Sequence, residues 1–116
     1  MKPFTLFYGR FPRACEKKLN GVTGKTPNGK YIVWINTEMD EATQAHTLRH
    51  ELAHLHFRHS EKTDYEEHFE RYEREANEYA DKMTGEELEY LLSFCTGKKT
   101  IPEGMLAAFD LAYKPA

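Results

Sequence analysis

Several features that define other classes of protein are missing from this sequence. It contains no run of about eighteen apolar residues, so we expect no membrane-spanning helix. The only two cysteines, Cys15 and Cys95, have no partner at CxxC spacing, which leaves no zinc knuckle and no disulfide framework. The first fifteen residues lack the apolar run and cleavage site of a secretion signal. We therefore expect a soluble, cytoplasmic protein with reduced thiols.

Length and charge indicate how many domains the protein has and whether it binds nucleic acid. The chain has 116 residues, of which 40% are hydrophobic, and this fits a single domain over residues 1–116. Residues 1–36 carry seven Lys or Arg against Glu16 alone, whereas residues 37–90 carry sixteen Asp or Glu against six Lys or Arg. The basic part lacks interleaved aromatic residues and any known reader motif. We expect solvated charge there, with no direct nucleic-acid binding.

The residue pattern changes once, near Asn36. Before it, FTLFYG and KYIVWIN are short β-branched and aromatic runs separated by turn sequences such as TPNGK, which predict a small antiparallel sheet. After it, the sequence predicts about four helices and therefore an α+β domain. The expected helices are one capped by Thr37 or Asp40 and ending between His56 and His59, one over residues 64–83, one opening with a Thr84/Glu87 capping box, and one opening with the same device at Thr100 and Glu103.

The stretch TLRHELAHLHFRH, residues 47–59, concentrates the groups that bind metals or move protons. His50 and His54 are four residues apart, so on a helix they share one face and can bind one ion. Glu51 lies about 100° round the helix from His50, where its carboxylate can reach a water on the metal without being a ligand. Zinc lowers the pKa of such a water to about 7, and the glutamate accepts and returns the proton.

A His-rich surface helix is the alternative interpretation of this HExxH stretch. The residues around the motif, Leu48, Leu52, Ala53 and Leu55, are all uncharged, as a helix packed on a sheet requires. This composition favours a buried helix that carries a metal site.

A catalytic zinc ion needs a third protein ligand and an open fourth position. The second predicted helix offers Glu73, which shares one stripe with Ala76, Asn77 and Ala80. The two alanines let this helix approach the first one closely, and Asn77 can hydrogen-bond a ligating histidine from outside the ligand set. The other nearby carboxylates, Glu70, Glu75 and Glu78, fall mostly on other faces and remain alternatives, better explained as a solvated acidic surface.

The remaining histidines are expected outside the ligand set. His46 lies one turn before His50, where a helix cap or a contact to a ligand suits it better than coordination. Structural or solvent-facing roles with partial exposure are expected for His56, His59 and His68. The transition-state oxyanion needs a further donor, and the sequence singles out none of the seven tyrosines.

The run YIVWINTEMDEATQAHTLRHELAHLHFRH, followed by EREANEYA, resembles the ImmA/IrrE family of small bacterial and phage zinc metallopeptidases. The resemblance implies a zincin-like fold with the HExxH helix packed on the sheet. It implies zinc ligands at His50, His54 and Glu73, a general base at Glu51, and a cleft beside the KYIVWIN strand, whose edge would pair with an extended substrate. It also implies a protein substrate, such as the transcriptional repressor of a phage or mobile element.

Two departures separate the chain from many relatives. It begins with strands where they have a helical segment, and it reads DKMTGEEL where they have an LLMP-like stretch. Two classes of function therefore stay open: a zinc-dependent endopeptidase, or a catalytically silent module that keeps the zincin scaffold and binds a regulator. An intact Glu51 favours the enzyme, because a structural metal site needs no base.

Overall fold

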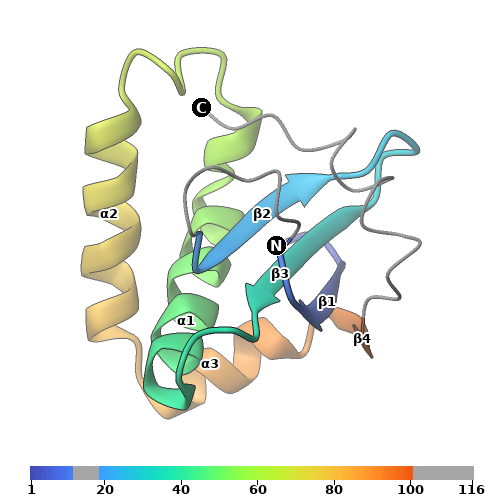
Figure 1. The fold of residues 1–116 in the computed structure, drawn as a ribbon. Helices are drawn as coiled ribbons and strands as arrows, with labels where there is room; N and C mark the ends of the chain where they lie inside the picture. Colours follow the sequence, from blue (N-terminus) through green and yellow to red (C-terminus); the bar gives the residue numbers. More distant parts are fainter. Residues whose placement is uncertain (12–18, 101–116) are drawn as a thin grey trace.

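The computed structural model describes residues 1–11 and 19–100. This part of the chain forms an α+β fold with four strands and three α-helices (Figure 1). The elements, in chain order, are β1 (Phe4–Gly9), β2 (Gly21–Lys25), β3 (Tyr31–Asn36), α1 (Glu41–Phe57), the 3-10 turn η1 (His59–Glu61), α2 (Phe69–Lys82), α3 (Gly85–Leu92) and β4 (Cys95–Thr100).

The sheet is mixed, so the expected antiparallel sheet is wrong. Its strand order is β2-β3-β1-β4, and β1 pairs in parallel with both β3 and β4. Only β2 and β3 are antiparallel, as a hairpin whose TPNG turn is closed by a 2.8 Å bond from the Gly29 N–H to the Thr26 carbonyl. Gly29 has φ +85°, a conformation that glycine adopts without steric cost.

Strand β3 is the buried centre of the sheet. All six of its residues are buried, and Val33, Trp34 and Ile35 have no exposed surface. Because β3 hydrogen-bonds to β2 on one edge and to β1 on the other, its edge cannot pair with a substrate, and that expectation is wrong. Among the described strands, β2 ends the sheet on this side.

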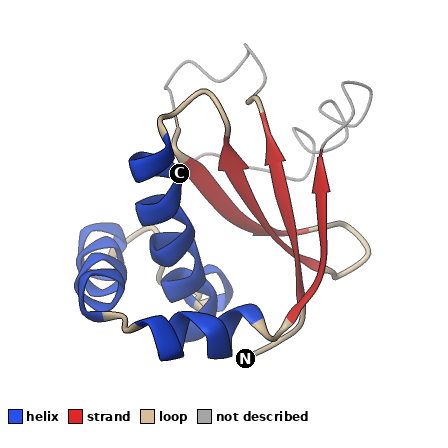
Figure 2. Cartoon of the chain, turned by 90° about the horizontal axis from the view of Figure 1, so that it is seen from below, coloured by secondary structure: helices blue, strands red, loops and turns tan. Residues whose placement is uncertain are grey.

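Helix α1 begins and ends close to the expected residues. Asp40 is its N-cap and accepts a 2.7 Å hydrogen bond from the Thr43 N–H, so Asp40 rather than Thr37 is the cap. The helix ends after Phe57, where Arg58 takes a left-handed conformation. Leu52 and Ala53 are fully buried, and α1 lies against one face of the sheet (Figure 2).

Helices α2 and α3 complete the helical layer. The second helix begins at Phe69 rather than at residue 64, and its alanines at 76 and 80 are buried as expected. The third begins after Thr84, whose hydroxyl accepts a hydrogen bond from the Glu87 N–H. No helix within the described residues combines the length and the apolar composition needed to cross a bilayer.

The chain returns to the sheet after α3. Strand β4, which the sequence pattern did not indicate, starts at Cys95 and ends at Thr100. The sequence predicts a fourth helix with its cap at Thr100 and Glu103, but the structure places Thr100 in β4. The rest of that predicted helix falls in residues 101–116, which lie outside the described residues. Cys95 is a half-buried free cysteine, and Cys15 also lies outside the described residues.

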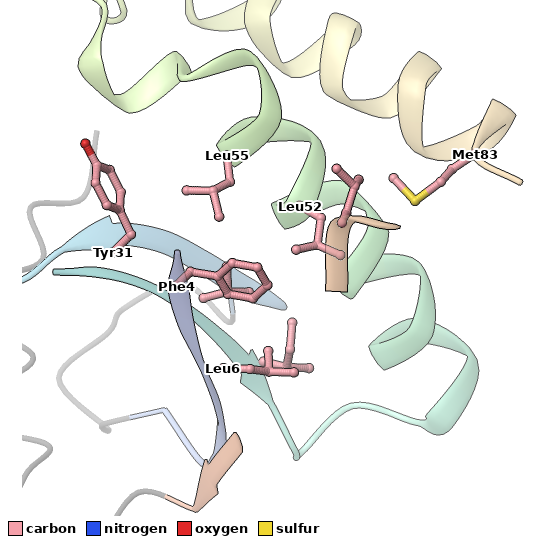
Figure 3. Close-up of a cluster of buried hydrophobic side chains, with 9 residues drawn as sticks. Phe4, Leu6, Tyr31, Leu52, Leu55 and Met83 are labelled. Carbon is pink, nitrogen blue, oxygen red and sulfur yellow. The ribbon is translucent and has the colours of Figure 1, made fainter. Parts of the chain in front are cut away.

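The hydrophobic core lies between the sheet and α1 (Figure 3). Phe4 and Leu6 project from β1, Leu52 and Leu55 project from α1, and Met83 enters from the end of α2. Since each of these side chains is at most 5% exposed, the core fixes α1 on the sheet.

Strand β2 approaches α1 so closely that one position has no room for a side chain. A Cβ atom at Gly21 would lie 2.5 Å from Cγ2 of Thr47, 3.0 Å from the Trp34 carbonyl oxygen and 3.3 Å from Cγ of Glu51. A Cβ at Gly24, in the same strand, would meet no atom within 4 Å.

Replacing Gly21 should therefore destabilise the protein, whereas the same change at Gly24 should not. We expect Gly21→Ala to lower the free energy of unfolding by about 1–3 kcal/mol, because the added methyl group overpacks the contact between β2 and α1. Gly24→Ala should stay within about 0.5 kcal/mol of the wild type. Urea unfolding measures both, and equal losses in the two variants would contradict this packing argument.

Candidate metal centre

Three side chains of types that can bind a metal ion converge from two helices. His50 and His54 project from α1, and Glu73 projects from α2. Nε2 of His50 lies 3.0 Å from Oε2 of Glu73, and Nε2 of His54 lies 3.0 Å from Oε1 of the same carboxylate. The two imidazole nitrogens are also 3.0 Å apart. The structure thus brings together the three residues that the sequence analysis named as ligands.

The local sequence explains this convergence. The four-residue spacing puts His50 and His54 on one face of α1, one turn apart. Ala76 and Ala80 are buried on the stripe of α2 that also carries Glu73, and their small side chains let the two helices come close. The short Glu73 side chain can then reach both histidines.

The geometry of the three donors fits a zinc ion. All three ligand atoms lie within 4.8 Å of one another. Ligands bound at about 2.0–2.1 Å around a tetrahedral zinc lie about 3.4 Å apart, which is close to the 3.0 Å between the two imidazole nitrogens and between each of them and one oxygen of Glu73. Two imidazoles and one carboxylate are also the donor types found in catalytic zinc sites.

The charges of the cluster reinforce one another. Burial disfavours the ionised form of Glu73, but hydrogen bonds from His50 and His54 outweigh it and hold the pKa of this carboxyl well below its usual value. Burial also disfavours the charged form of His50, yet the bond to Glu73 and the charges of Glu51 and Glu73 raise its pKa. The cluster therefore keeps an ionised carboxylate beside the two imidazoles, as a cation site requires.

Glu51 lies beside this cluster and contacts a different partner. Its side chain is buried at 6% exposure, and Oε2 accepts a 2.6 Å hydrogen bond from the Thr23 hydroxyl of β2. Burial raises the pKa of Glu51, and His54 and the Thr23 bond offset only part of that effect. Thr23 was not predicted from the sequence, where its only signal is a hydroxyl between Val22 and Gly24 in a short strand.

Asn77 and Tyr65 approach the ligands from outside the cluster. Asn77 is exposed on α2, and its carboxamide adds to the effects that raise the pKa of His50. No hydrogen bond, however, reaches Nδ1 of His50 within the described residues. The Tyr65 hydroxyl lies 3.5 Å from Oε1 of Glu73, a contact that the sequence did not indicate.

The other histidines divide into exposed and buried ones. His46, His56 and His68 are exposed. His59 has no exposed surface, so the expectation of partial exposure is wrong for this residue. Burial lowers the pKa of His59, against the opposing effect of Glu75, which contacts its ring.

The fold and the cluster define a small α+β protein with a candidate metal centre between two helices. Comparison with protein-family models identifies its family: the chain belongs to the M78 peptidases, described as the IrrE N-terminal-like domain, with residues 8–91 matched. This confirms the resemblance to the ImmA/IrrE family and indicates a metallopeptidase-type function. Comparisons with curated proteins and with solved structures gave no match.

Because its pKa is raised, buried Glu51 should destabilise the metal-free protein as the pH rises. The folded protein holds the Glu51 proton to a higher pH than the unfolded chain, whose carboxyl titrates near 4.5. Stability is therefore lost as the pH rises from that value through the folded pKa. Glutamine carries no such charge. Unfolding with a chelator present should show Glu51→Gln gaining stability relative to the wild type as the pH rises above about 4.5, until the pH passes the folded pKa of Glu51, and a pH-independent difference would contradict this.

Proposed function

We propose that the protein is a zinc-dependent endopeptidase that hydrolyses a peptide bond in a protein substrate. The observation that carries the proposal is the convergence of His50, His54 and Glu73 beside a buried glutamate. Three protein ligands are the number that catalytic zinc takes, with the fourth position left for water or substrate. Membership of the M78 peptidase family supports the same chemistry. The HExxH helix packed on a sheet supports a zincin-like arrangement.

Each residue has a defined task in this proposal. His50, His54 and Glu73 hold the ion. When bound, zinc supplies Lewis acidity, which polarises a carbonyl and makes a water more acidic. Glu51 accepts a proton from the water as the water oxygen bonds to the carbonyl carbon. It then delivers that proton to the leaving nitrogen as the C–N bond breaks. The Thr23 hydroxyl orients the Glu51 carboxylate.

Strand β2 is the proposed docking edge for the substrate backbone. It ends the described sheet, and its Thr23 contacts the proposed base. An extended peptide that adds to this edge by main-chain hydrogen bonds would pass close to Glu51. The Tyr65 hydroxyl, 3.5 Å from Glu73, is the group we propose as the oxyanion donor.

A DNA-binding repressor is the class of substrate to test first, because the resemblance to the ImmA/IrrE family points to it. The contact is proposed with the protein and not with DNA. A catalytically silent module that only grips such a regulator is the competing function, and the variants below separate the two.

The purified protein should contain about one zinc per chain. We expect His50→Ala and Glu73→Ala to lose most of it, because each removes one of three ligands. Since zinc would tie α1 to α2, its removal by a chelator should also lower the melting temperature. Elemental analysis and thermal unfolding measure the two effects, and full metal occupancy in both variants would refute the ligand assignment.

Glu51→Gln should retain zinc and lose hydrolysis. Glutamine has nearly the same size but cannot accept the proton, and general-base catalysis contributes about 10²–10⁴ in rate. The matched control is Glu70→Gln, which neutralises an exposed carboxylate in the first turn of α2. The assay follows cleavage of a candidate DNA-binding repressor, such as a repressor-like product of a neighbouring gene where one is found, since a narrow peptidase can ignore casein and short peptides.

The same variant separates the two functions. If Glu51→Gln still produces the full biological effect on the repressor, the protein works by binding. If the effect disappears while zinc content and repressor binding persist, the protein works by hydrolysis.

A further inference from the structure

The second ring nitrogen of His54 starts a series of side-chain contacts that leads away from the proposed metal, through buried His59 to the half-exposed Glu75. Nδ1 of His54 lies 2.9 Å from Nδ1 of His59, and Nε2 of His59 lies 2.7 Å from Oε1 of Glu75. The exposed fraction is 6% for His54 and 0% for His59. These contacts thus run from α1 through η1 to α2, and solvent does not reach His59 in the middle.

The chemistry of the last member fixes the direction of every hydrogen bond in this chain. An ionised carboxylate only accepts, so Glu75 requires the proton of His59 to be on Nε2. A neutral imidazole carries one proton, and full burial favours the neutral ring. Nδ1 of His59 is then an acceptor, and Nδ1 of His54 must donate to it. With a metal in the site, the remaining nitrogen of His54, Nε2, therefore offers its lone pair to the ion, in place of the contact with Oε1 of Glu73 that it makes in the metal-free structure.

That lone pair points at the proposed metal position. Nε2 of His54 is the atom that lies 3.0 Å from both Nε2 of His50 and Oε1 of Glu73. The opposite tautomer would place a proton there and block coordination. His50 has no equivalent support, because its buried Nδ1 has no hydrogen-bond partner within the described residues. The series of contacts through His59 and Glu75 therefore supports His54 and not His50.

We propose that His59 and Glu75 are positioning residues that hold His54 in the tautomer whose Nε2 binds the metal. This inference rests on the proposed zinc site. Neither residue touches the metal or the substrate, and each acts through the ring beside it. Metal-ligating histidines commonly donate their second nitrogen to such a partner, and removal of the partner costs about 10–100-fold in metal affinity.

Zinc affinity, measured by competition with a chromophoric chelator, tests the role of these hydrogen bonds. His59→Leu fills the space but cannot accept the hydrogen bond from Nδ1 of His54, so we expect zinc to bind about 10–100-fold more weakly. His59→Asn places a carboxamide oxygen where Nδ1 lies, and it should recover most of the affinity. Glu75→Ala should weaken binding, whereas Glu78→Ala, which removes an exposed carboxylate from the same helix, should leave the affinity unchanged.

The hydrogen bond between the two rings can be observed in the zinc-bound protein. Proton–nitrogen spectra of the protein labelled with ¹⁵N-histidine should show the His54 proton on Nδ1, protected from exchange with water by its bond to His59. In His59→Leu, which offers no acceptor, this proton should exchange faster. A role of His59 in packing alone would not move this signal, and rescue by asparagine would not follow from packing either.

The outcomes separate this inference from the function on which it rests. A wild-type protein that binds no zinc would overturn the proposed function. A wild type that binds zinc, together with His59→Leu and Glu75→Ala that bind it equally tightly, would overturn this inference alone. If His59→Leu does not fold, Glu75→Ala and His59→Asn decide the question by the same measurements.

Discussion

The close approach of α1 to its two neighbours is the constraint on which the candidate site depends. On one side, Gly21 of β2 leaves no space for even a methyl group against Thr47 and Glu51. On the other side, Ala76 and Ala80 of α2 are buried. Glutamate and histidine side chains are short, so they can meet only where the backbones behind them come close. Small residues at these positions supply that proximity.

The same closeness places polar groups where water cannot solvate them. Glu51, His54 and His59 are all at most 6% exposed, and burying such groups costs free energy unless they are hydrogen-bonded. Thr23 provides the bond for Glu51, and Glu75 provides it for His59. Burial of the apolar core between the sheet and α1 offsets the remaining cost, so the domain can keep these polar groups buried.

The sequence predicted correctly those features that depend only on residues a few positions apart. The cap at Asp40, the cap at Thr84 and the meeting of His50 with His54 all follow from spacings of three or four residues. The direction of the strands does not follow from such spacings, because a short apolar run reads the same in parallel and antiparallel pairs. One signal for the mixed sheet was nevertheless present: YIVWIN is apolar almost throughout, which is typical of a strand buried on both faces.

His59 could not be placed by helical spacing, because the helix stops before it. In a continuing helix, a residue five positions after His54 would lie about 140° round the axis and could not reach its ring. Arg58 instead takes φ 59°, and its N–H bonds back to the His54 and Leu55 carbonyls. A non-glycine residue in this left-handed region costs about 1–2 kcal/mol. The end of α1 at Arg58 turns the backbone so that His59 lies buried beside His54. The left-handed conformation of Arg58 therefore makes the contact between the two imidazole rings possible.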